Sequence, residues 1–224
     1  MIATAKISEY DGSRLVLFPD IPLEREILRK RIMEVELHLT DGRQISPEQR
    51  RKIYALIRDI SNWSGHEPEY LKQYLKWSFC SSDGREDFSL SDVDMTTARE
   101  FLTFIIEFCF YNNVPTTDSM LDRTDDIGKY LYMCLEYRKC AICNKKAEVH
   151  HVEGSRIGIG RDREGIVHEG LEAIALCSEH HSEAHMDERG LFELHHIYGI
   201  KLDSYLCDRL KLKKNSDKLM LQAP

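Results

Sequence analysis

The stretch from Cys140 to His185 constrains the fold most, because it places cysteine and histidine pairs at spacings that suit metal ions. The pairs read Cys140-x-x-Cys143, His150-His151, Cys177-x-x-His180 and His181-x-x-x-His185. Packing alone does not require so many such side chains within fifty residues. We therefore expect this part of the chain to be organised around bound metal.

One set of these residues has the spacing of a structural zinc site. Cys140, Cys143, Cys177 and His180 follow the pattern Cys-x-x-Cys…Cys-x-x-His, which suits closed tetrahedral coordination. His181 is an alternative fourth ligand, but His180 keeps the two-residue gap that separates Cys140 from Cys143.

The remaining histidines form a second set. On a helix, His181 and His185 share one face and can bind one ion. His150 and His151 are adjacent in a segment that looks extended, so their side chains point to opposite sides. One of the two can therefore bind the ion while the other faces elsewhere.

Residues 138–190 resemble the ββα-metal fold of HNH endonucleases, and most closely the zinc-stapled phage proteins, with a histidine geometry similar to colicin-type DNases. The resemblance implies that His150, His181 and His185 bind a catalytic divalent ion, Mg²⁺ or Mn²⁺. It also implies that His151 is the general base.

The chain departs from the HNH pattern at the central asparagine, because residues 171–177 read LEAIALC. His168, Glu169 or Glu172 can replace this asparagine, or a backbone carbonyl can orient the base. An alternative is a purely structural or inactive DNA-binding module.

Composition is that of an ordinary soluble globular protein, with 42% hydrophobic and 31% charged residues. No apolar run approaches the roughly 20 residues of a membrane span, and the N-terminus lacks a signal-peptide core. Seven cysteines with zinc spacing or apolar surroundings indicate a reducing compartment, the cytoplasm of a host cell if the chain is phage-encoded. The net charge of −7 argues against nucleic acid, but it averages over faces and omits bound metal.

The N-terminal part predicts hairpins followed by helices. Asp11-Gly12 marks a turn within residues 2–18, and residues 32–40 alternate like a half-buried strand that returns at 43–45. Ser46 and Glu67-Pro68 begin two helices, and Asp94 or Thr96 begins a third, which runs to about Asn112 and is apolar nearly all round. Burial in a core or a subunit interface would explain that third helix.

Several cationic residues are candidates for contacts with DNA, although each has an ordinary solvated alternative. They are Arg50, Arg51, Lys52, Lys72, Lys76, Arg156, Arg161 and Arg163. Aromatic residues among Lys72 and Lys76 could stack on bases, but we expect Leu71, Tyr74 and Leu75 to be core.

The polar segment 115–124 predicts a boundary between domains 1–120 and 121–224. We expect a helix from 127 to 138 to lead into the metal-binding segment, the helix of His181 and His185 to end near Gly190, and two short helices to follow it. His195 and His196 are expected to be surface or packing residues.

Residues 1–125 resemble, in layout, the Orf (NinB) recombination mediators of phages. That resemblance implies a homodimer that binds single-stranded DNA and works with single-strand-binding protein. The whole chain is similar to fusions of such a domain with an HNH module.

These observations predict an α+β protein: N-terminal hairpins and helices, then a zinc-stapled ββα-metal module with a helical extension. The function expected is a divalent-metal-dependent DNA endonuclease or nickase of phage recombination, acting on single-stranded or branched DNA. The alternative is a non-catalytic recombination mediator with a degenerate HNH module.

Overall fold

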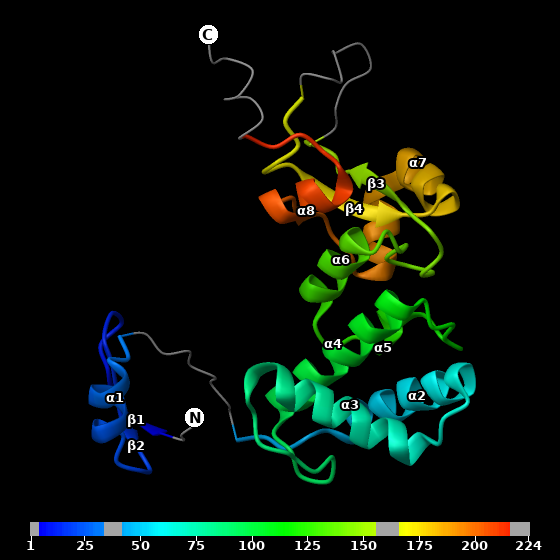
Figure 1. The fold of residues 1–224 in the computed structure, drawn as a ribbon. Helices are drawn as coiled ribbons and strands as arrows, with labels where there is room; N and C mark the ends of the chain where they lie inside the picture. The colour runs from blue at the N-terminus through cyan, green and yellow to red at the C-terminus, as the bar shows by residue number, and fades with distance from the viewer. Residues whose placement is uncertain (1–4, 34–41, 156–165, 216–224) are drawn as a thin grey trace.

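The computed structural model describes residues 5–33, 42–155 and 166–215, and the fold mixes helices with small sheets (Figure 1). The elements in chain order are β1 (Ala5–Tyr10), β2 (Leu15–Pro19), α1 (Glu24–Lys30), α2 (Pro47–Ser64), α3 (Pro68–Asp83), α4 (Met95–Asn112), α5 (Met120–Arg123), α6 (Ile127–Glu136), β3 (Glu148–His151), β4 (Glu172–Leu176), α7 (Ser178–His195), β5 (Ile200–Lys201) and α8 (Ser204–Leu210). This arrangement agrees with the predicted α+β class. No helix in the described ranges is long and apolar enough to cross a membrane.

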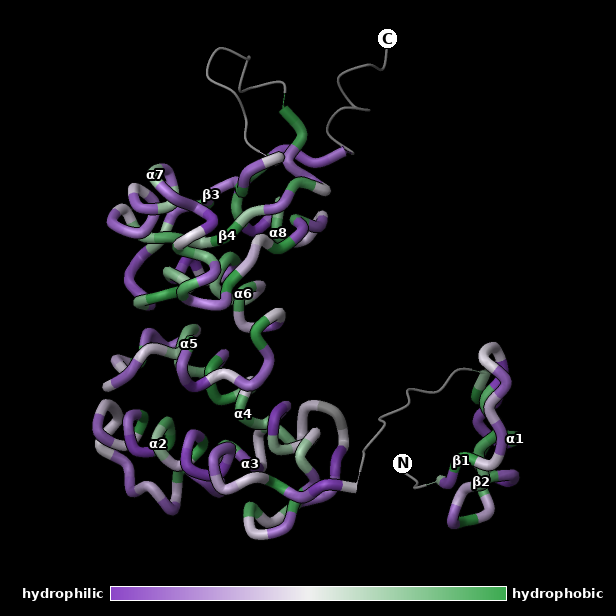
Figure 2. Tube along the Cα trace, turned by 180° about the vertical axis from the view of Figure 1, so that it is seen from behind, coloured by the Kyte–Doolittle hydropathy of each residue, from purple (hydrophilic) through white to green (hydrophobic). Residues whose placement is uncertain are grey.

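The first predicted hairpin is confirmed, since β1 and β2 pair antiparallel. The Asp11 carboxylate closes the turn by accepting from the backbone N–H groups of Ser13 and Arg14 at 2.9 and 2.7 Å. The hairpin and α1 stand apart from the other elements in both views (Figures 1 and 2). Most of the predicted strand at 32–40 lies outside the described residues. In place of the short strand predicted at 43–45, the structure has a single bridge from Gln44 to Asp94.

Local capping chemistry fixes where α2 and α4 begin, as predicted. The Ser46 hydroxyl accepts from the backbone N–H of Gln49, and the Gln49 side chain accepts from that of Ser46, both at 3.0 Å. The Asp94 carboxylate accepts from the backbone N–H groups of Thr96 and Thr97. These bonds satisfy backbone donors that a helix start otherwise leaves unpaired.

Helices α2, α3 and α4 pack on one another around fully buried side chains such as Ile53, Leu75 and Phe101. Burial in the chain's own core accounts for the apolar character of α4, so this character does not by itself require a subunit interface. The homodimer stays a prediction.

One prediction about α3 was wrong. Leu71 and Leu75 are buried as expected, but Tyr74 is 42% exposed. Tyr74 lies on the outer face of α3 with Tyr70 and Trp77, because positions 70, 74 and 77 share one side of a helix.

The hydrophobic core continues without a break from Ile45 to Leu210. Figure 2 shows the hydrophobic stretches of α4, α6 and β4 along the middle of this body, whereas α7 is largely hydrophilic. A buried ion pair joins the two halves: Arg123 in α5 donates to Asp59 in α2 at 2.6 Å, and both side chains are 5% exposed. The predicted division at residue 120 stays a prediction.

In the C-terminal part, β4 pairs antiparallel with both β3 and β5. Helix α6 packs against β4 and α8, and α7 packs against β3 and β4. The first helical segment of α7 ends at Asp187, three residues before the predicted end near Gly190, because the backbone of Asp187 is non-helical. A second short segment then runs to His195, and the Asp187 carboxylate caps its start by accepting from the backbone N–H of Gly190 at 2.9 Å.

We predict that Asp59→Ala lowers the free energy of unfolding by about 3–5 kcal/mol, because it leaves the buried Arg123 guanidinium without its buried partner and with the exposed carboxylate of Asp118. The matched control is Glu193→Ala, which breaks a solvent-exposed pair with Arg189 and should change stability little. Chemical denaturation followed by circular dichroism measures both. Equal effects of the two substitutions would contradict the prediction.

Candidate metal centres

Three cysteines and one histidine converge between α6 and α7, and we call them the Cys–His cluster: Cys140, Cys143, Cys177 and His180. Cys140 and Cys143 lie on a tight turn closed by the backbone N–H of Cys140, which donates to the carbonyl of Lys145 at 2.7 Å. Cys177 is the N-cap of α7, and His180 lies in its first turn. The structure thus brings together the four residues that the spacing predicted.

The distances within the Cys–His cluster suit zinc. The sulfurs of Cys143 and Cys177 are 3.7 Å apart, and His180 Nδ1 lies 3.3 Å from the sulfurs of Cys140 and Cys177. Tetrahedral zinc separates two sulfur ligands by about 3.8 Å, and a sulfur from a nitrogen by about 3.6 Å. The donor atoms therefore already approximate the edges of a zinc tetrahedron.

The electrostatics of the thiols also favour a cation. Burial, together with the neighbouring thiols, raises the pKa of Cys143 to about 12. Burial opposes ionisation of Cys177 too, but the backbone N–H of His180 and the other two thiols lower its pKa. Thiols in contact cannot all ionise without a positive charge among them, and a metal ion supplies that charge.

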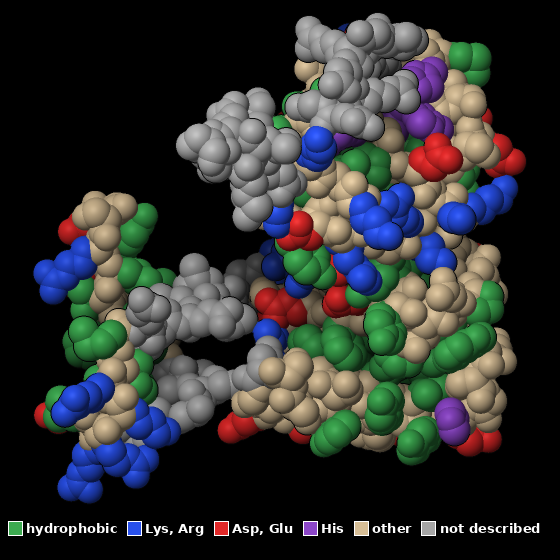
Figure 3. Space-filling model, turned by 45° about the horizontal axis from the view of Figure 1, so that its top comes forward, with side chains coloured by type: hydrophobic (Ala, Val, Ile, Leu, Met, Phe, Trp, Pro, Cys, Tyr) green, Lys and Arg blue, Asp and Glu red, His purple; other side chains and the backbone are tan. Residues whose placement is uncertain are grey.

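The second group, the histidine triad, consists of His150, His181 and His185, whose ligand atoms lie within 4.8 Å of one another. His150 in β3 is 1% exposed and faces α7, where His181 and His185 lie one turn apart. Burial is the largest cause that lowers the pKa of His181, and the nearby rings of His150 and His185 lower it further. Neutral imidazole is the form that binds metal. Figure 3 shows histidine side chains gathered at the surface of this part of the molecule.

Glu188 completes the surroundings of the triad, and the sequence interpretation missed it. One of its carboxylate oxygens lies 2.7 Å from His150 Nε2, and the other accepts from the backbone N–H of Glu153 at 2.7 Å. A carboxylate on one ring nitrogen orients a ligating histidine and leaves its other nitrogen for the ion. Glu188 follows His185 by three residues, but the non-helical backbone at Asp187 lies between them, so helical spacing gave no signal for Glu188.

His151 points away from the triad, as the alternation along β3 predicted. Its Nε2 lies 3.0 Å from Nδ1 of His168, and the two rings are tilted against each other. Burial is the largest cause that lowers the pKa of His151 to about 4, and the neighbouring His168 and His150 add to this effect. His151 is therefore neutral at pH 7 and can accept a proton.

Among the candidates for the missing asparagine, the structure places His168 against His151. The loop that carries His168 is held by its backbone, which donates to the carbonyl of Lys213 at 2.8 Å. Glu169 instead accepts from the backbone N–H of Asn215, and Glu172 lies within β4.

The predicted cationic residues separate into groups. Arg156, Arg161 and Arg163 lie outside the described residues. Arg51 is exposed on α2, whereas Lys52 is part-buried and pairs with Asp125 at 2.7 Å, so the prediction of a solvated face was wrong for Lys52. The other three line one pocket: Arg50, Lys72 and Lys76.

The C-terminal module has two antiparallel strands followed by a helix. Strand β3 turns one histidine towards the triad and the next towards His168. This arrangement is that of HNH-type nucleases. A profile of the family described as "Putative HNHc nuclease" matches residues 21–213, so the chain belongs to this family. Neither a curated protein nor a solved structure matches the chain.

We predict that Cys177→Ser releases about one zinc per chain and lowers the melting temperature, because serine is a poor zinc ligand. The control is Cys80→Ser, which changes a buried thiol outside both metal groups and should keep the zinc. Elemental analysis of the purified proteins measures the metal content. Wild-type protein purified without zinc would contradict the assignment.

Proposed function

We propose that the chain is a divalent-metal-dependent DNA endonuclease or nickase that hydrolyses phosphodiester bonds. One observation carries the proposal: β3 presents His150 to the triad on one side and the neutral His151 on the other. The potential metal site thus uses His150, whereas the proton acceptor is the neighbouring His151, so the two roles fall on different imidazole rings. Membership of the nuclease family supports the same reaction class.

In this proposal His151 removes the proton from the attacking water. In this role His151 Nε2–H donates to Nδ1 of His168, so Nδ1 of His151 is unprotonated and accepts the proton of the water. His168 is a positioning residue that holds the ring in this orientation and does the work of the absent asparagine. The lowered pKa keeps His151 unprotonated at neutral pH and at the same time makes the ring a weaker base.

His150, His181 and His185 would hold Mg²⁺ or Mn²⁺, with Glu188 orienting His150. The bound ion would supply positive charge that stabilises the phosphate and the leaving oxygen in the transition state. Three protein ligands leave coordination positions open for substrate.

The Cys–His cluster has a structural role in this proposal. Zinc on its four residues would join the turn at Cys140 to the start of α7. His180 and His181 are adjacent, so fixing His180 also fixes the helix that carries His181 and His185. We propose that a zinc-stapled ββα-metal module results.

A second candidate function is a recombination mediator that binds single-stranded DNA and single-strand-binding protein without cutting, as a homodimer. The exposed aromatic side chains of α3 and the cations beside them favour a DNA-binding role for residues 1–120. For both candidate functions we propose a phage origin, a role in recombination and a place in the host cytoplasm. A nicking assay on supercoiled plasmid with Mg²⁺, Mn²⁺ or neither separates the two functions, because the mediator leaves the plasmid intact.

We predict that His150→Ala and His151→Ala fail in different ways. His150→Ala weakens ion binding, so a large excess of Mn²⁺ should restore part of its cleavage. His151→Ala should bind DNA and metal normally, yet cut about 10²–10⁴-fold more slowly at any metal concentration. Plasmid nicking across a Mn²⁺ titration measures both. Rescue of His151→Ala, but not of His150→Ala, would exchange their roles.

We predict that His168→Ala lowers kcat by about 10- to 100-fold with little change in KM, since the base loses its orienting partner. His168→Asn, which restores the residue type usual in HNH sequences, should recover much of that loss. Glu169→Ala is the control, because Glu169 contacts Asn215 instead. Similar kinetics for the alanine and asparagine variants would argue against a positioning role.

A further inference from the structure

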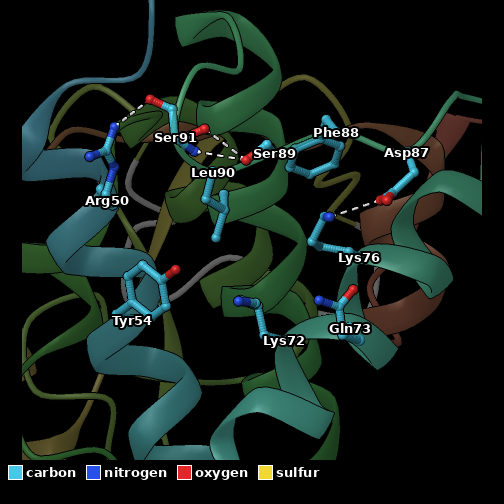
Figure 4. A pocket seen from close by; sticks show the side chains of 10 residues that line it. All are labelled: Arg50, Tyr54, Lys72, Gln73, Lys76, Asp87, Phe88, Ser89, Leu90 and Ser91. Carbon is cyan, nitrogen blue, oxygen red and sulfur yellow. Dashed lines mark hydrogen bonds and ion pairs between the residues drawn. The ribbon is translucent and has the colours of Figure 1, made fainter.

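A pocket of about 540 Å³ opens between α2, α3 and the segment 87–91, away from both metal groups. Figure 4 shows Arg50 and Tyr54 reaching into it from α2, and Lys72, Gln73 and Lys76 from α3. We propose that this pocket holds one nucleotide unit of single-stranded DNA, with its phosphate on Arg50, Lys72 and Lys76. The inference rests on DNA being the substrate of the proposed function.

The charge of the lining favours an anion. Three cations meet two carboxylates, that of Asp87 in the lining and that of Glu69 beside Lys72, so the site keeps a net positive charge in a chain whose net charge is −7. Arg50 donates from one terminal nitrogen to the carbonyl of Ser91 at 2.8 Å, while its buried Nε has no hydrogen-bond partner among the described residues. Such a concentration of positive charge in an acidic protein indicates a site for a negatively charged ligand.

The two lysines are held in place by partners that a phosphate can displace. Lys72 pairs with Glu69 at 2.8 Å and Lys76 with Asp87 at 2.9 Å, but both carboxylates are more than 70% exposed. Only the carboxylate ends of these pairs face the solvent, so a phosphate can take their place while the ammonium groups stay paired. Aromatic rings of the lining also hold the ammonium groups, since Lys76 lies 5.2 Å from the centre of the Phe88 ring and Lys72 lies 6.0 Å from that of Tyr54.

An exposed aromatic row on the next face of α3 points to a single strand. Tyr70, Tyr74 and Trp77 are 57%, 42% and 65% exposed, with neighbouring ring centroids 6.3 Å apart. Unpaired bases stack on such rings, whereas a duplex keeps its bases stacked on each other. Figure 3 shows hydrophobic side chains, with tyrosine and tryptophan counted among them, over the lower part of the molecule.

Helices α2 and α3, which carry the pocket, and helix α7, which carries His181 and His185, lie at opposite ends of the body from α2 to α8, with α4 and α6 between them (Figure 1). A bound strand would therefore be held at a distance from the place where it is cut. The pocket would retain substrate without taking part in the chemistry.

Fluorescence anisotropy with a labelled oligothymidylate of about 16 nucleotides tests the inference. The full chain carries His151→Ala, and no Mg²⁺ or Mn²⁺ is added, so that binding is measured without cleavage. Lys72→Gln should weaken binding about fivefold and reduce the slope of log K against log salt by about 0.7, the contribution of one phosphate contact. The control Lys129→Gln removes the same charge from an exposed site on α6 and should change neither value.

The carboxylate partners give a test of opposite sign. Glu69→Gln and Asp87→Asn each remove a negative charge that competes for a lysine, so they should strengthen binding about two- to fivefold. If the ion pairs only support the fold, these substitutions and Lys72→Gln will change binding in the same direction. That result would overturn the inference.

The choice of a single strand is tested separately. Trp77→Ala should weaken binding of the oligothymidylate about tenfold, and a duplex of equal length should bind less tightly. Equal binding of duplex and single strand, or no effect of Trp77→Ala, would rule out the single-strand assignment. Plasmid cleavage by variants that keep His151 is scored independently, so a failure of the pocket is distinguishable from a failure of the nuclease.

Discussion

The alternation of side chains along β3 is the constraint on which the candidate site depends. Successive residues of a strand point to opposite faces, and β3 is paired with β4 so that His150 lies opposite Ile174 and His151 opposite Ala173. His150 is thereby buried against α7, and His151 faces the loop that carries His168. A shift of one residue would exchange the two histidines and separate His150 from His181 and His185.

The start of α7 couples the two metal groups. Cys177 and His180 belong to the Cys–His cluster, and the adjacent His181 begins the helical part of the triad. Adjacent residues on a helix are about 100° apart, so one turn can serve two ions. The kink at Asp187 then brings Glu188 to His150 and to the end of β3. The geometry of the triad therefore depends on the first turn of α7 keeping its helical conformation.

The N-terminal helices are continuous with this module through one hydrophobic core. Helix α4 packs against α6, and the buried pair of Asp59 and Arg123 lies at the junction. Lys52 reaches the same junction by pairing with Asp125, which removes it from the cations that remain on the surface. The pocket of Arg50, Lys72 and Lys76 is lined by α2, α3 and the segment 87–91 and includes none of the residues of this junction.

The sequence by itself determined what depends on neighbouring residues. The spacing of Cys140, Cys143, Cys177 and His180 predicted their cluster, and Ser46 and Asp94 predicted where two helices begin, because ligand spacing and capping are local. Only the tertiary structure decided the contacts between His168 and His151, between Glu188 and His150, and between Lys52 and Asp125. It also decided that Tyr74 is exposed and that α4 is buried in its own chain. These outcomes depend on which surfaces meet after folding, and no local pattern of residues specifies that.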